Sequence, residues 1–183
     1  DFDRLVASVQ DFAREDAGRG RLRDSMRARA LADVVQTYPA VYVEAGYIHV
    51  YLSRALGRVL PGSCSIRHLH LLEPVLRSRI GRRQLLAPGD VLTFLYTFHP
   101  EHQSPRADLL AAQSMIYNKV VAKEQLPTSP SEPFPHLEDE IQAISLASAL
   151  DYEQCRQVYA RVKSLSVPEA REYIRSWQRN RRH

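Results

Sequence analysis

Apolar residues recur at intervals of three and four positions along almost the whole chain, and this spacing limits the possible folds more than any other feature. In a helix, it gathers apolar side chains on one stripe that can pack against a neighbouring helix. No run alternates cleanly between apolar and polar residues, and Val41, Tyr42 and Val43 come nearest to an exception. We therefore predict an all-α fold, a helical-hairpin, solenoid-like bundle with a smaller C-terminal helical unit.

Helix-ending residues divide this pattern into separate helices. Gly18 and Gly20 should end a short first helix, and Tyr38-Pro39 should end the second, because a residue before proline disfavours the helical conformation. Gly81 should close a helix that bends near Pro74. The helices are expected at about residues 2–12, 21–36, 41–60, 66–80, 88–98, 105–125, 137–150 and 151–164, and from residue 166 onwards.

Four of these helices have a capping residue directly before them: Ser65, Ser104, Asp151 and Ser166. The stretch at residues 126–135 contains four prolines and should be extended, which makes it the one linker in the chain. We therefore expect three parts. These are a helical-hairpin region at 1–125, the proline-rich linker at 126–135 and a C-terminal helical unit at 136–183.

Two stretches at a constant offset of 43 positions look alike, namely AGYIHVYL at 45–52 and PGDVLTFL at 88–95. Glycine, Ile/Val, Tyr/Phe and Leu coincide in them, and a short turn and a second helix should follow each. This pattern predicts two stacked helical hairpins, each of about 40 residues, because one hairpin cannot bury its own apolar face. A chance likeness between two amphipathic helices is the alternative.

The second stretch extends to LLAPGDVLTFLYTF at 85–98 and continues through ADLL at 107–110. It is similar to the degenerate hairpin repeats of the FAST-kinase and octotricopeptide proteins, which are organellar RNA-binding helical repeats. The resemblance covers residues 41–123 and rests on helix–turn–helix length and a rhythm of apolar, Asp, apolar and aromatic residues. It implies a helical-hairpin fold and an RNA partner, although none of the family's RNA-reading residues has a matching position here.

Arginine makes up almost all of the basic residues in the chain. Of its 25 basic residues only Lys119, Lys123 and Lys163 are lysines, and the formal net charge is +4. The planar guanidinium binds phosphate and carboxylate bidentately, so this composition favours an anionic partner. A GC-rich genome would produce the same bias.

The positive charge is concentrated in two parts of the sequence. Residues 54–83 contain seven arginines against Glu73, and residues 161–183 contain seven basic residues against two glutamates. Residues 124–160 are acidic. The candidate RNA-binding residues are Arg77, Arg79, Arg82 and Arg83 at the end of one helix, and Arg171, Arg175, Arg179 and Arg182 on one stripe of the last helix.

Two alternatives stay open for these charged and aromatic residues. The acidic and basic segments could pair inside one fold or lie on solvated faces, and Trp177 and Tyr173 could anchor the last helix to the core. Under the RNA hypothesis, both aromatic rings could stack on unpaired bases. Phosphate contacts would then dominate, and binding would depend strongly on salt.

Catalytic and metal-binding patterns are poor in this sequence. Zinc could in principle take ligands from Cys64, His68, His70, His99 and His102, but His-Leu-His on a helix points its two rings apart and Pro100 interrupts the second pair. Neither Cys64 nor Cys155 has an activating neighbour in sequence, and nucleotide-binding and hydrolase signatures do not occur. We predict no catalysis, no metal and no cofactor.

Two function hypotheses follow from these observations. The first is a non-catalytic RNA-associated structural subunit of a large ribonucleoprotein assembly such as an organellar ribosome, with structured or ribosomal RNA and other protein subunits as partners. The alternative is an α-helical protein–protein interaction scaffold that docks a partner on residues 126–135 and the acidic helix after them. No stretch is apolar enough for a membrane span. With only two cysteines and no visible signal or transit peptide, we expect an intracellular location, with mitochondria as one candidate compartment.

Overall fold

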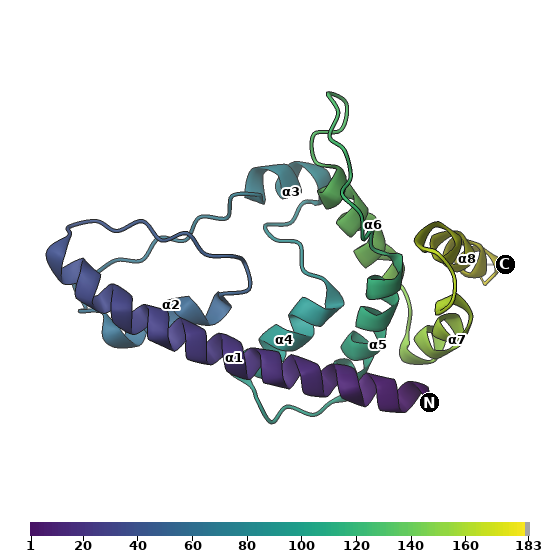
Figure 1. The fold of residues 1–183 in the computed structure, drawn as a ribbon, viewed down its shortest axis with the longest axis horizontal. Coiled ribbons are helices and arrows are strands. Elements are labelled where there is room, and N and C mark those ends of the chain that lie inside the picture. Colours follow the sequence, from purple (N-terminus) through teal and green to yellow (C-terminus); the bar gives the residue numbers. More distant parts are fainter. Residues whose placement is uncertain (182–183) are drawn as a thin grey trace. The chain divides into compact units, whose positions relative to one another are not determined.

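The computed structural model describes residues 1–181, and this part of the chain is all-α, as predicted, with eight helices and no strand (Figure 1). The helix bounds are α1 Phe2–Thr37, α2 Val50–Val59, α3 Glu73–Ile80, α4 Pro88–Phe98, α5 Pro105–Val120, α6 Pro135–Ser148, α7 Tyr152–Val162 and α8 Val167–Asn180.

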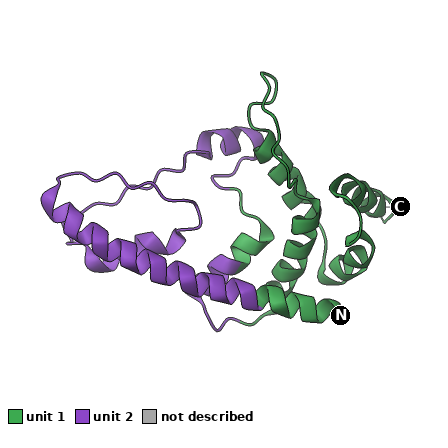
Figure 2. Cartoon of the chain, viewed as in Figure 1, with its two compact units in different colours: residues 1–10, 85–92, 103–183 green, residues 11–84, 93–102 purple. Residues whose placement is uncertain are grey.

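The chain divides into two compact units (Figure 2). Unit 1 consists of residues 1–10, 85–92 and 103–183, and unit 2 consists of residues 11–84 and 93–102. This division differs from the expected one at the proline-rich segment, because α5 before the segment and α6 to α8 after it all belong to unit 1. The segment is non-helical up to Phe134, but it is not extended throughout, because Ser129 and Glu132 exchange two backbone hydrogen bonds in a turn and the Leu126 N–H donates to the His136 ring. It joins two helices of one unit.

Unit 1 is built around α5, which packs against α6, α7 and α8. Ser104 caps α5 by accepting a hydrogen bond from the Ala107 N–H, and alanines let the neighbouring helices come close. Gln113, nearly buried, donates to the carbonyl oxygen of Leu150 at 2.8 Å. Gly89 lets the start of α4 approach α5 closely, since a Cβ at this position would lie 2.8 Å from the Ser114 Oγ.

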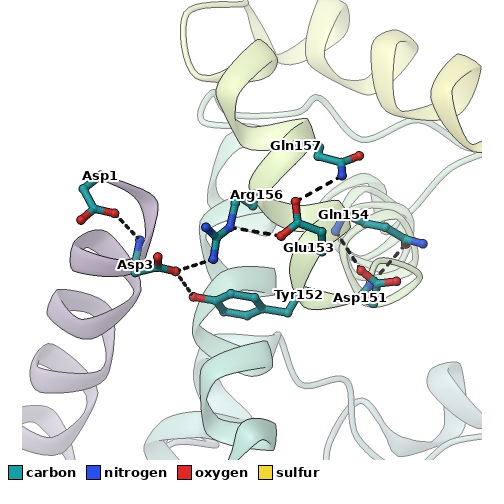
Figure 3. Close-up of polar contacts among 8 residues, drawn as sticks. All are labelled: Asp1, Asp3, Asp151, Tyr152, Glu153, Gln154, Arg156 and Gln157. Carbon is teal, nitrogen blue, oxygen red and sulfur yellow. Dashed lines mark hydrogen bonds and ion pairs between the residues drawn. The ribbon is translucent and has the colours of Figure 1, made fainter.

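The start of α1 is bonded to α7 within unit 1 (Figure 3). One carboxylate oxygen of Asp3 accepts hydrogen bonds from the Tyr152 hydroxyl at 2.6 Å and from Arg156 at 2.8 Å. Burial, together with Asp3, raises the pKa of Tyr152 to about 12, so the phenol keeps its proton and stays a donor. The Phe2 ring packs on Tyr152 at a centroid distance of 5.7 Å and completes this contact.

Unit 2 has a small core and a large exposed apolar surface. A buried cluster of Ala28, Leu52, Ala55 and Leu56 joins α1 to α2. By contrast, fifteen of the seventeen exposed large hydrophobic residues in the described chain lie in this unit. Isolated exposed apolar residues are ordinary on a protein surface, but such a concentration is typical of a surface that contacts a partner.

Several predicted helix bounds were wrong, and all of the larger errors lie in unit 2. Gly18 and Gly20 do not end a helix, because α1 continues through both for 36 residues. The helix expected at 41–60 begins only at Val50, and the one expected at 66–80 begins only at Glu73. The stretches at 45–52 and 88–95 are therefore not structural equivalents, since the first is mostly non-helical.

The predicted capping signals were confirmed except at Ser65, which precedes no helix because α3 begins only at Glu73. Asp151 and Ser166 each form a complete capping box at the start of α7 and α8, and Pro168 lies in the first turn of α8. Gly81 closes α3 with φ of 68°, a left-handed conformation that favours glycine.

Candidate functional site

One charged side chain in unit 2 lies almost completely out of water, the carboxylate of Asp24 in α1. Only 1% of Asp24 is exposed. It shares the buried face of the helix with Ala17 and Ala28, which lie seven positions before it and four after it. Because a buried carboxylate is costly unless it is paired, its partners identify the site.

The partner of Asp24 is His49, the residue directly before α2. His49 Nδ1 lies 2.7 Å from Asp24 Oδ1, and the histidine side chain is 14% exposed. The Arg27 Nη1 lies 2.8 Å and 2.7 Å from the two ring nitrogens of His49 and 4.0 Å from the carboxylate. Asp24, Arg27 and His49 thus form a linked group, which we name the Asp24–His49 site.

The geometry of this site fixes the orientation of the imidazole. With the ring proton on Nδ1, His49 donates to Asp24, and its Nε2 can accept from Arg27. A carboxylate that orients a histidine in this way is the arrangement used to hold a general base in one tautomer. The same contacts also join the start of α2 to the middle of α1, so they have a structural role as well.

The candidate arginines next to α3 are exposed but partly engaged with one glutamate. Arg77 and Arg83 both bond to the Glu73 Oε1, at 2.7 and 3.1 Å. The hydrogen bond from Arg77 comes first among the effects that lower the pKa of Glu73, and Arg83 adds to it. Arg79 and Arg82 are exposed as well, but it is Arg77 and Arg83 that the contacts with Glu73 bring together.

The candidate arginines on α8 are mostly bonded within unit 1. Arg171 forms a nearly buried ion pair with Asp139 at 2.6 Å and also donates to the Val120 carbonyl oxygen at 2.7 Å. Arg179 pairs with Glu172 at 3.0 Å, and Arg175 contacts Gln142 at 3.4 Å. Arg182 lies outside the described residues. Arg171 is therefore held by an internal ion pair that helps to pack α5, α6 and α8.

The aromatic residues named with these arginines lie on α8 too. Trp177 is half-buried and lies beneath the Arg181 guanidinium, 4.6 Å from the ring centroid. Tyr173 is also half-buried. Neither ring is fully exposed for stacking on a base, which gives them less weight than the arginines of unit 2.

The units differ sharply in charge. Unit 2 contains thirteen arginines and no lysine against eight acidic residues, so its formal charge is +5. It also contains five of the seven histidines. Unit 1 has twelve basic residues against thirteen acidic ones, which makes it close to neutral. The excess positive charge of the protein is therefore carried by unit 2.

Residues 1–181 contain no group of three or more His, Cys, Asp and Glu side chains placed to hold a metal ion. Cys64 is exposed, and His68 bonds to the Ser53 hydroxyl group at 3.0 Å. Burial raises the pKa of Cys155 to about 12, so this thiol stays protonated at neutral pH. None of the helices in the described chain is long and apolar enough to cross a membrane.

Sequence reasoning missed the Asp24–His49 site. Asp24 could have been found because it interrupts the alanine stripe of α1 at Ala17 and Ala28, where an acidic residue is out of place. His49 gave no comparable signal, since it lies 25 positions away and only the fold brings the two together.

Comparison with known proteins gave one relative. The chain is 30% identical over 161 residues to an uncharacterized protein of Archaeoglobus fulgidus. The match covers 88% of this chain and 54% of the relative, so the chain spans about half the length of the relative that it matches. No protein-family description and no solved structure matches the chain.

Proposed function

We propose that the protein is a non-catalytic RNA-associated component of a ribonucleoprotein assembly, and that unit 2 contacts the RNA. The observation that carries this proposal is the charge of unit 2, with thirteen arginines against eight acidic residues. Ribosomal RNA as the partner and a mitochondrial compartment stay predictions from the sequence.

Several arginines of unit 2 have their charge available for phosphate. Arg23, Arg29, Arg67 and Arg82 are exposed and form no ion pair within residues 1–181. Each phosphate that such an arginine neutralises releases condensed counterions, so affinity falls as salt rises. The guanidinium also binds phosphate oxygens with two parallel hydrogen bonds, which favours the arginine-rich composition seen here.

Charge reversal in unit 2 tests this proposal. In the double variant Arg67→Glu/Arg82→Glu, we expect RNA affinity at low salt to fall by about tenfold or more. The slope of log affinity against log salt should fall by roughly one to two, since each lost phosphate contact removes about 0.7 to 0.9. Fluorescence anisotropy with a labelled RNA over a salt series measures both quantities.

A matched control separates local charge from total charge. Arg106→Glu/Arg161→Glu makes the same change in net charge on exposed residues of unit 1 and should leave binding nearly unchanged. The proposal is wrong if the wild-type chain does not bind RNA at low salt, or if both double variants lose affinity equally.

The Asp24–His49 site supports a second candidate function, proton transfer to or from an anionic substrate. In this function Arg27 would bind the anion, and its movement off the imidazole would leave His49 Nε2 free to accept a proton. The buried carboxylate of Asp24 would hold the ring and stabilise the imidazolium that forms.

Hydrolysis assays on anionic chromogenic esters, including phosphomonoesters and phosphodiesters, test the second candidate. If this second function holds, at least one class is turned over, and His49→Gln lowers the turnover by about 100-fold or more because a general base is lost. His68→Gln, a change of an exposed histidine in the same unit, should leave turnover unchanged. Absence of turnover, or equal losses in both variants, would contradict this function.

A further inference from the structure

The segment between α1 and α2 is an exposed and strongly apolar run. Every residue from 38 to 48 is exposed, and none of these residues lies in a helix. Six of the eleven are large hydrophobic residues with exposed fractions between 36% and 78%: Tyr38, Val41, Tyr42, Val43, Tyr47 and Ile48. Glu44 is the only charged residue in the run, so favourable hydration of charged side chains does not explain why the run is exposed.

The backbone of this segment is unpaired. Within residues 1–181, no backbone N–H or C=O group of residues 39–45 takes part in a hydrogen bond. The residue types at 41–43 are β-branched and aromatic, which fit a pleated sheet better than a helix. A non-helical run with these residues and a free backbone can serve as an unpartnered edge strand.

Both ends of the segment are held in place. Tyr38 N–H donates to the Val34 carbonyl oxygen at the end of α1, and His49 is bonded to Asp24 farther back along the same helix. The segment therefore returns along α1 between two fixed points, which reduces the entropy that it would lose on pairing with another chain.

We propose that residues 40–45 add as a strand to the edge of a β-sheet in a partner domain. This inference goes beyond RNA association and does not depend on it. The matched Archaeoglobus fulgidus relative has room for such a domain, because the match accounts for only 54% of its length. Main-chain hydrogen bonds would give the affinity, and the apolar side chains would be covered at the same time.

Strand geometry assigns the side chains of the segment to two faces. Val41, Val43 and Ala45 share one face, and Tyr42 and Glu44 share the other. The first face is apolar and small enough to pack against the interior of a sheet domain. The second face combines an amphipathic ring with a charge, which suits the rim of an interface.

A chimeric protein provides the test. In this protein the present chain replaces the matched part of the relative, so that the unmatched part is held at high effective concentration. Hydrogen–deuterium exchange then compares the amides of residues 40–45 in the chimera and in the present chain alone. We expect exchange to slow by about tenfold or more in the chimera, because paired amides exchange only on opening.

Proline substitutions identify the bonded edge. Successive N–H groups of a strand point to opposite edges, so at least one of Tyr42→Pro and Val43→Pro should remove the protection. Ser65→Pro makes the same change in another exposed, non-helical segment, and this variant should keep the protection of residues 40–45. The proposal is overturned if the amides of residues 40–45 exchange equally fast in the chimera and in the chain alone. It is also overturned if their protection in the chimera survives both Tyr42→Pro and Val43→Pro, each tested as a single variant. A third contradicting outcome is protection of these amides in the chain alone, either at high protein concentration or after RNA is added, because a second copy of the chain or the RNA would then cover the segment.

Discussion

Asp24 shows how much a single residue can reveal about a helix. An acidic residue between two buried alanines costs free energy unless a partner offsets it, and the partner here is His49. The sequence could have marked Asp24 from its place on the stripe. It could not have identified His49, since the pairing depends on where α2 begins, and that bound was predicted nine residues too early.

The arginines of α8 show the opposite limit at the same scale. Arg171, Arg175 and Arg179 follow one helical spacing and look equivalent in the sequence. In the fold, Arg171 is nearly buried against Asp139, whereas Arg179 is exposed and pairs on its own helix with Glu172. Spacing along a helix says which residues share a face, but the identity of the neighbouring helix decides which of them are free to bind RNA.

At the scale of elements, most capping signals were reliable, although Ser65 precedes no helix and Gly18 and Gly20 do not end one. Ser104, Asp151, Ser166 and Gly81 end or begin helices as predicted, because each acts on backbone groups within four residues. The exposed apolar residues before α2 gave a false helical signal. A helix was expected from residue 41, but Val and Tyr have weak helix propensity, and no packed neighbour within unit 2 compensates.

The continuity of α1 across Gly18 and Gly20 yields a prediction for that helix. A Cβ at Gly20 would meet no atom within 4 Å, and the backbone is helical there. We expect Gly20→Ala to stabilise the protein by up to about 1 kcal/mol, because alanine loses less backbone entropy in a helix. Thermal unfolding monitored by circular dichroism measures the change.

Gly81 is the matched control for this prediction. It also has open space around a Cβ, but its φ is 68°. Gly81→Ala should therefore destabilise the protein by roughly 1 kcal/mol, because an L-residue is strained in this conformation. If Gly20→Ala destabilised the protein as well, α1 would be interrupted near Gly20, as the sequence first suggested.

At the scale of the whole molecule, the fold regroups the charges seen along the sequence. The acidic segment at 124–160 and the basic segment at 161–183 both belong to unit 1, where they nearly cancel. Arg171 and Asp139 show one such pairing directly. The basic segment at 54–83 belongs to unit 2 and has no acidic segment to balance it, which is why unit 2 is the better candidate for RNA.

The pH dependence of stability should contain two opposing contributions. Hydrogen bonds lower the pKa of three glutamate carboxyls. The first-ranked donor is Arg77 for Glu73, Ser166 for Glu169 and Arg179 for Glu172. A lowered pKa stabilises the folded state above the unfolded value, and this contribution is lost as the pH falls through the folded pKa. Acidification should therefore weaken these contacts.

Glu140 on α6 should act in the other direction. Desolvation, followed by the charges of Asp90 and Asp139, raises the pKa of Glu140 in the folded protein. The folded state then binds its proton more tightly than the unfolded chain, so this contribution to stability falls as the pH rises from the unfolded to the folded pKa. We expect Glu140→Gln to be more stable than the wild type at neutral pH. The difference should vanish below the unfolded pKa, where Glu140 is protonated in both states.

Urea unfolding across a pH series measures the effect of Glu140→Gln, with Glu124→Gln as the control. Glu124 is exposed and forms no ion pair within the described part of the chain, so its variant should follow the wild type at every pH. A gain in stability for Glu140→Gln that is independent of pH would instead indicate better packing by the amide. A loss at neutral pH would show that ionised Glu140 is stabilised by a partner, and that Asp90 and Asp139 do not dominate its surroundings.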